Sequence, residues 1–170
     1  MKYPKLFESC VIEVLKNEGG YVNDHDDKGG ETNFGISKKS HPKVDVINLT
    51  EDEARDIYYN EYYVPNEYLL VPSNEQYSAM VFDCIVNHGS KVTVILIQRA
   101  LRSVGLTLDD DGCFGHITRS YYKSSTNEYT IFLLETALRC ERAGFYRCLV
   151  AKNPTMSKFL RGWLVRAYGC

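Results

Sequence analysis

The sequence lacks any run close to the roughly 20 apolar residues that a membrane-spanning helix needs. Its first ten residues, MKYPKLFESC, are interrupted by charged residues and a proline. We therefore expect neither a membrane anchor nor a secretory signal peptide. With 44% apolar and 25% charged residues in 170 positions, the composition is that of a soluble globular domain. One domain, or two small lobes that share a core, is expected.

The sequence also lacks a basic cluster, and its formal net charge is −2. Nucleic-acid binding needs a patch of Lys and Arg, so nucleic acid is not an expected partner, and no strong overall attraction to an anionic polymer is expected.

Metal-binding motifs are missing too: the four histidines form no HExxH motif and no pair four residues apart. The DDDG segment at 109–112 has no later carboxylate at the spacing of an EF-hand and is predicted to be a turn. No metal and no cofactor is predicted.

CxxC pairs are absent as well, because the six cysteines are scattered singly. We predict that most of them are small buried hydrophobic residues. An even number leaves disulfides open in an oxidising compartment, where fifteen pairings are conceivable.

What the sequence does contain is helical periodicity. Phe7, Val11, Val14 and Glu18 follow one stripe, and Gly19-Gly20 then ends the predicted helix. Further helices are predicted to start at the capping boxes Thr50/Glu53 and Ser73/Gln76, after a break at 87–89, near Thr118, over 127–151 and around 159–167. In the 127–151 helix we expect Phe132 and Leu133 to point inward, and Gln98 and Trp163 are predicted to be structural. The fold class is mainly α, with a small irregular or β element around ETNFGIS, after the first helix.

Glu18, Asp27 and Thr32 form the strongest candidate site. A general acid must be protonated near neutrality, and an apolar stripe and a helix C-terminus would both raise the pKa of Glu18. Asp27 lies in a polar turn, where an ionised carboxylate could position water or stabilise positive charge on a sugar ring. Thr32 could hold that water, and Gly29-Gly30 would let backbone amides approach a saccharide. Singly, Glu18 would be a helix-end residue and Asp27 a turn residue, but their joint spacing favours glycosidic cleavage.

The segment EGGYVNDHDDKGGETNFGIS, residues 18–37, closely resembles the signature of the family 108 glycoside hydrolases, muramidases of phages and bacteria. FDCIVNHGSKVTVILIQRAL and LDDDGCFGHIT resemble that family's C-terminal peptidoglycan-binding region. The spacing of Glu18, Asp27 and Thr32 is also similar to the Glu, Asp and Thr set of T4-type phage lysozymes, with Thr32 one position closer. His25 departs from the proline that is common in the family.

The resemblance implies a lysozyme-like helical protein that hydrolyses the β-1,4 bond between N-acetylmuramic acid and N-acetylglucosamine, with Glu18 as the catalytic acid. Some members are secretion activators, which implies a role in protein release or lysis and a holin-type membrane protein as a partner beside peptidoglycan. We expect a protein made in the cytoplasm without a signal peptide that acts in the periplasm or cell wall.

We assign residues 1–72 to a catalytic lobe and residues 73–170 to a helical peptidoglycan-binding lobe that shares its core. The predicted substrate-binding residues are Tyr21, Gly29, Gly30, Asn33, Asn87 and His88. For Asn87 and His88 a helix C-cap is an equal alternative. Two other functions stay open: a lytic transglycosylase, which also needs one glutamate, and a non-enzymatic cell-wall-binding secretion module.

Overall fold

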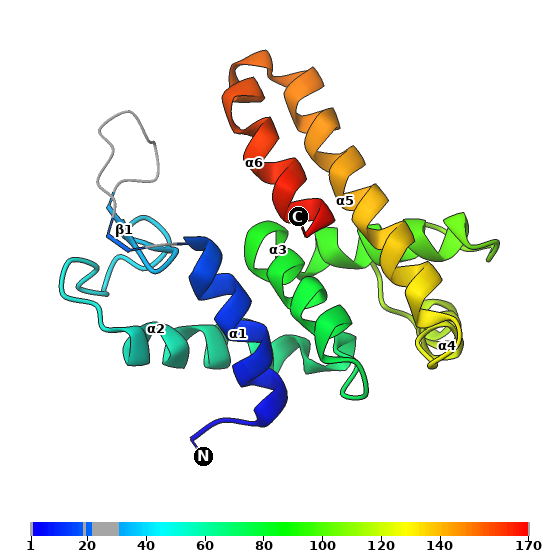
Figure 1. The fold of residues 1–170 in the computed structure, drawn as a ribbon, viewed down its shortest axis with the longest axis horizontal. Helices are drawn as coiled ribbons and strands as arrows, with labels where there is room; N and C mark the ends of the chain where they lie inside the picture. The colour runs from blue at the N-terminus through cyan, green and yellow to red at the C-terminus, as the bar shows by residue number, and fades with distance from the viewer. Residues whose placement is uncertain (1, 19, 22–30, 170) are drawn as a thin grey trace. The chain divides into compact units, whose positions relative to one another are not determined.

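The computed structural model describes residues 2–18, 20–21 and 31–169. In chain order the elements are α1 (Lys5–Glu18), β1 (Thr32–Asn33), β2 (Ile36–Ser37), α2 (Glu51–Ile57), the π-helix η1 (Tyr58–Tyr63), the 3₁₀-helix η2 (Val64–Leu69), α3 (Glu75–Ser103), α4 (His116–Ser125), α5 (Ile131–Lys152), the 3₁₀-helix η3 (Pro154–Met156) and α6 (Ser157–Tyr168). The structure is 69% helical and contains one small sheet within the described ranges (Figure 1). The predicted fold class, mainly α and lysozyme-like with a small β element after the first helix, is confirmed.

The chain forms two compact units, Met1–Asn87 and His88–Cys170. It passes from one to the other inside α3, where Gly89 has φ 76° and ψ 163° and interrupts the helical backbone. The helix break that the sequence predicted at 87–89 is therefore confirmed. By length and composition α3 could cross a membrane, but a core helix passes the same test, and 56% of its most apolar window is buried.

In the first unit, α1 places its predicted apolar stripe in the core. Phe7, Val11 and Val14 are all fully buried. The Phe7 ring lies 5.1 Å from the Tyr59 ring and 5.2 Å from the Tyr63 ring, both edge-on. Such edge-to-face pairs add attraction to the apolar area that they bury. The aromatic side chains of η1 thus fix the position of α1.

The helical segment that begins with α2 starts where the sequence predicted but ends later than predicted. Thr50 and Glu53 form the capping box, with Thr50 N donating to the Glu53 carboxylate across 2.9 Å. We expected Pro65 to stop this helix, but the chain remains helical through η1 and η2 to Leu69. Pro65 lies in the first turn of η2, a position that tolerates proline because its fixed φ is helical.

In the second unit, α6 lies antiparallel to α5 and packs against it (Figure 1). Their shared core contains Ala143, Tyr146 and Ala167, and Trp163 packs on it, as predicted for a structural tryptophan. At the other end of α5 the predicted register is wrong. Phe132 and Leu133 are 72% and 57% exposed, whereas their neighbours Ile131 and Leu134 are buried.

The cysteines divide into two groups. Cys10 and Cys84 are buried, as predicted, and burial raises the pKa of the Cys10 thiol to about 12. Cys113, Cys140 and Cys148 are exposed, so the prediction fails for these three. These five described cysteines are not joined by disulfides.

Candidate functional site

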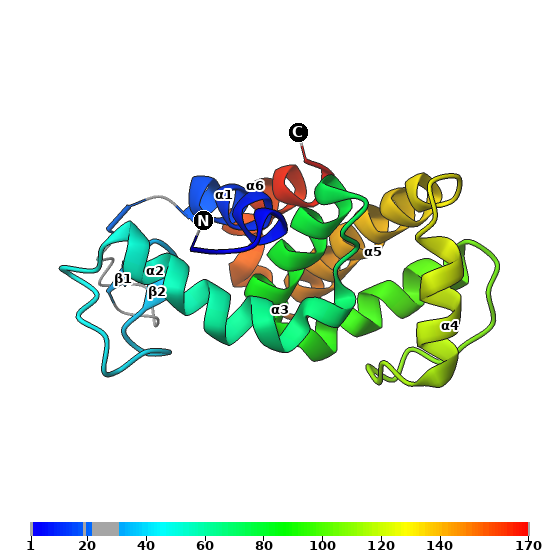
Figure 2. The ribbon, with the colours of Figure 1, turned by 90° about the horizontal axis from the view of Figure 1, so that it is seen from below.

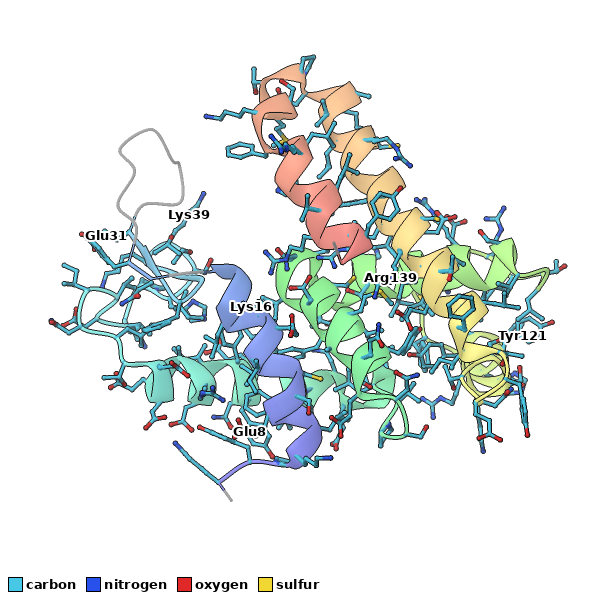
Figure 3. All side chains as sticks on the ribbon, in the orientation of Figure 1. Glu8, Lys16, Glu31, Lys39, Tyr121 and Arg139 are labelled. Carbon is cyan, nitrogen blue, oxygen red and sulfur yellow. The ribbon has the colours of Figure 1, made fainter. Side chains whose placement is uncertain are left out.

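The backbone places Glu18 as the last residue of α1, directly after the buried stripe. The helix is held near its start by Glu8, whose carboxylate lies 2.6 Å from Arg55 on α2. Arg55 also pairs with Glu51 across 2.8 Å. Figure 3 shows Glu8 and Lys16 toward opposite ends of α1. The start of α1 is therefore anchored to α2 within the first unit. The side chain of Glu18 lies outside the described part of the structure, as do Asp27, Gly29 and Gly30.

Thr32 lies on the first strand of a β-hairpin, where it pairs with Ser37, and Asn33 pairs with Ile36. The two turn residues, Phe34 and Gly35, have φ of 49° and 77°. Two positive φ values in a two-residue loop are typical of the type I′ turn, whose twist matches that of the flanking strands. The hairpin predicted around ETNFGIS is thus confirmed.

Contacts with later segments hold this hairpin. Tyr58 of η1 donates its hydroxyl proton to the Phe34 carbonyl across 2.8 Å. His41, whose side chain is only 9% exposed, lies with Nε2 3.0 Å from the Glu61 carboxylate. The hairpin and α2 lie near each other in both ribbon views (Figures 1 and 2). No short-range sequence pattern points to His41, because its partner Glu61 is 20 residues away.

Asn33, a predicted substrate-binding residue, is 6% exposed. Its side-chain amide donates to the carbonyls of Val46 and Leu49, at 3.0 and 3.3 Å. The amide group therefore fixes the loop after the hairpin. A direct contact with substrate stays a prediction for this residue, as it does for Thr32.

The other predicted substrate-binding residues have different surroundings. Tyr21 is 45% exposed, so its ring is available to a ligand. Asn87 donates its amide to the Asp83 carbonyl across 2.7 Å. In the second unit the His88 ring lies 4.9 Å from the ring of Phe145. Since Gly89 takes the positive φ that follows them, the helix-end interpretation describes the local structure of Asn87 and His88.

The predicted turn at 109–112 is organised by a buried glutamine. Gln98 is 1% exposed, and its amide donates to the Asp111 carboxylate, the Cys113 carbonyl and the Thr118 hydroxyl. Its carbonyl accepts from Gly112 N across 2.9 Å. The prediction that Gln98 is structural is confirmed, and the DGxxGxxT pattern is the sequence signal of this arrangement.

Hydrogen bonds within the protein engage the carboxylate of Asp111 in this turn. The Cys113 amide and then the Gln98 amide hold the pKa of Asp111 below its ordinary value. Within the described ranges, no group of three or more His, Cys, Asp or Glu side chains could hold a metal ion.

Comparison with known protein families identifies the domains that these elements form. Residues 11–89 match the model of the family described as Glycosyl hydrolase 108. Residues 92–168 match a second model, described as Predicted Peptidoglycan domain. The chain contains a glycosyl hydrolase 108 domain followed by a peptidoglycan domain. It is therefore a glycoside hydrolase, and its second domain identifies peptidoglycan as its substrate and partner. The chain is a peptidoglycan hydrolase.

A solved structure supports the fold of this chain. The chain is similar to Brucella abortus SagA, with a TM-score of 0.71 and 24% identity over 95% of this chain and 89% of that one. No curated protein matches the chain significantly. The gap between the two family models lies just after Gly89, close to the boundary of the compact units. A functional division at residue 72 stays a prediction.

Proposed function

We propose that this peptidoglycan hydrolase is an N-acetylmuramidase. It cleaves the β-1,4 bond between N-acetylmuramic acid and N-acetylglucosamine, and Glu18 is its general acid. The observation that supports the assignment most is the place of Glu18 at the end of α1, inside the segment that matches the hydrolase family. A glycosidase of this kind needs a carboxylic acid that donates a proton to the leaving oxygen.

The end of an apolar helix suits this task. Carbonyl groups at a helix C-terminus present partial negative charge, which disfavours ionisation of a nearby carboxyl group. Because the α1 stripe is buried up to Val14, the backbone of the next turn starts from a fixed position. A general acid needs such fixed geometry as well as a raised pKa.

Asp27 and Thr32 act in support of Glu18 in this proposal. Asp27 orients water or stabilises the positive charge that develops on the sugar ring, and Thr32 holds that water from the hairpin. The hairpin is suited to this role because the Tyr58 hydroxyl and the Asn33 amide tie it to neighbouring segments. We further propose that Tyr21 stacks on a sugar ring and that Gly29 and Gly30 let the backbone approach the glycan. Asn33, Asn87 and His88 would border the same substrate.

The biological role that we propose is protein release through the cell wall, or lysis. Peptidoglycan lies outside the cytoplasmic membrane, so an enzyme made in the cytoplasm has to cross that membrane to reach it. We propose a holin-type membrane protein as the partner for this step, with action in the periplasm or cell wall.

The assignment of Glu18 is tested by comparing two glutamates of the same helix. Glu13 is exposed on α1, so Glu13→Gln removes an equal charge without touching the proposed site. Soluble glycan released from purified sacculi should fall about 100-fold or more with Glu18→Gln, the typical value of a general acid, and stay near wild type with Glu13→Gln. Equal activity of the two variants would overturn the role of Glu18. Circular dichroism of both variants checks that they are folded.

A further inference from the structure

The charge of the chain is distributed unevenly. All 22 acidic residues lie at or before Glu141, whereas six of the 20 basic residues lie after it. These six are Arg142, Arg147, Lys152, Lys158, Arg161 and Arg166. The net charge of −2 therefore conceals a segment, the end of α5 and all of α6, that is purely basic. The expectation of no strong overall attraction to an anionic polymer rests on the net charge and does not describe this segment.

One side of α6 contains a hollow with an apolar lining. The hollow is lined by Ser157, Leu160, Arg161, Leu164, Val165 and Tyr168. Leu160 and Leu164 also pack toward α5, which fixes the floor of the hollow. Val165 and Tyr168 remain 47% and 40% exposed. Large apolar groups that stay accessible beside a polar rim are a common sign of a binding site.

Arg161 is the single charged residue in this lining. It is exposed and forms no ion pair with any described residue. Other arginines of the chain are paired: Arg139, labelled in Figure 3, with Glu135 across 2.8 Å, and Arg102 with Asp110 across 2.9 Å. The acidic residues that could neutralise Arg161 are absent from its own helix and from the end of α5. Its guanidinium group is thus available to an anionic ligand.

We propose that this hollow on α6 binds the stem peptide of peptidoglycan, with Arg161 pairing with a free carboxylate of that peptide. The proposal rests on the peptidoglycan hydrolase function and names a part of the substrate that the glycosidic reaction does not touch. Guanidinium groups bind carboxylates through two parallel hydrogen bonds, a geometry that a lysine cannot supply.

The chemical groups of the stem peptide are complementary to the residues that line the hollow. The carboxyl group of N-acetylmuramic acid is linked to the peptide as an amide, so the free carboxylates of peptidoglycan belong to the stem peptides. Alanine methyl groups of such a peptide fit against Leu160, Leu164 and Val165. The hydroxyl groups of Ser157 and Tyr168 are suited to hydrogen bonds with peptide amides.

An anionic membrane surface would also attract basic residues. A membrane-binding helix presents a broad face of several cations around exposed apolar residues. Although α6 also carries Lys158 and Arg166, Arg161 is the only cation that lines the hollow, and this lining suits a narrow ligand with one carboxylate. The whole of α6 also falls within the match to the peptidoglycan domain. The stem peptide is therefore the occupant that the observations favour.

The test uses Arg161→Met and the matched control Lys158→Met. Both variants remove one exposed positive charge from α6, but Lys158 does not line the hollow; its ammonium lies 4.9 Å from the Phe159 ring centre. Hydrolysis is measured on intact sacculi and on glycan strands whose stem peptides have been removed by an amidase. Arg161→Met should raise the KM on intact sacculi roughly 10-fold, as expected for one charge-assisted pair, and leave the KM on stripped glycan unchanged. Lys158→Met should match wild type on both substrates.

Three outcomes of the hydrolysis assay would overturn the proposal: an equal loss on both substrates, no loss on either, or an equal loss with Lys158→Met. Sedimentation with intact sacculi, competed by free tetrapeptide, gives a second readout that needs no turnover. If the wild type cleaves neither substrate, the hydrolase proposal fails, yet competition by the tetrapeptide that Arg161→Met abolishes would still support the subsite. Arg161-dependent binding to phosphatidylglycerol vesicles without competition by tetrapeptide would assign the hollow to a membrane and overturn it.

Discussion

The amide of Gln98 donates to the carboxylate of Asp111 across 2.9 Å, although the two residues belong to different segments of the second unit. The same glutamine accepts the Gly112 amide proton, so both ends of its side chain are used. Because Gln98 is buried on α3, it ties the turn at 109–112 to the core of that unit. The turn is therefore held by the fold itself.

Gln98→Leu should destabilise the protein by about 3 kcal/mol. The leucine fills a similar volume but leaves the Gly112 amide and the Thr118 hydroxyl without this partner, and each buried polar group left unsatisfied costs about 1–3 kcal/mol. Urea unfolding followed by circular dichroism measures the change. Arg102→Met, which breaks an exposed ion pair near the same turn, should cost at most about 1 kcal/mol. A Gln98→Leu variant no less stable than this control would show that the turn does not depend on Gln98.

The start of α3 provides a second prediction. The sequence suggested that Ser73 and Gln76 cap this helix, but the side chain of Asn74 accepts from Tyr77 N across 2.8 Å. Asn74→Ala should therefore cost about 1 kcal/mol of unfolding free energy, the usual value of an N-cap. Ser73→Ala, at an exposed turn position, should cost less than about 0.5 kcal/mol. The reverse order of the two denaturation midpoints would restore Ser73 as the cap.

The register of α5, meaning which of its residues face the core, provides a third prediction. Leu134 is 1% exposed and its neighbour Leu133 is 57% exposed. Leu134→Ala should cost about 2–5 kcal/mol, because it leaves a cavity in the core, while Leu133→Ala should stay within about 0.5 kcal/mol of wild type. The two thermal unfolding curves measure the difference directly. Similar losses for both leucines would mean that the α5 register differs from the one described.

These cases show which features of the fold could be predicted from the sequence. The apolar stripe on α1 and the capping box at Thr50 were predictable because each depends only on residues that are a few positions apart in the sequence. In the IFLL segment at 131–134 every residue is apolar, so periodicity alone could not decide which of them face the core. Asn74 lies beside an equally suitable Ser73, and only the backbone conformation distinguishes them. The His41–Glu61 pair could not be predicted, because no short-range pattern connects its partners.

The pH dependence of stability provides a fourth prediction. The hydrogen bond from Arg99, together with the charges of Arg99 and Arg102, holds the pKa of Asp110 below its ordinary value. A carboxyl group with a lowered folded-state pKa stabilises the protein above its unfolded pKa of about 4, and that contribution disappears as pH falls through the folded value. As the pH falls from about 5 to about 2, the free energy of unfolding of Asp110→Asn should therefore decrease less than that of the wild type.

The control for this prediction is Asp109→Asn, because Asp109 forms no ion pair with any described residue. Urea midpoints recorded at several pH values give the slopes of the three proteins. We expect the Asp109→Asn slope to follow wild type and the Asp110→Asn slope to be shallower. Parallel slopes for all three would indicate that the Arg99–Asp110 pair does not persist in solution.

The central claim is that the protein hydrolyses the bond after N-acetylmuramic acid and that Glu18 donates the proton. Mass spectrometry of the fragments from purified peptidoglycan, digested in parallel by the wild type and by Glu18→Gln, tests both parts at once. The account predicts reducing N-acetylmuramic acid ends from the wild type and none above background from Glu18→Gln. Anhydro ends in place of reducing ends, or undiminished cleavage by Glu18→Gln, would contradict it.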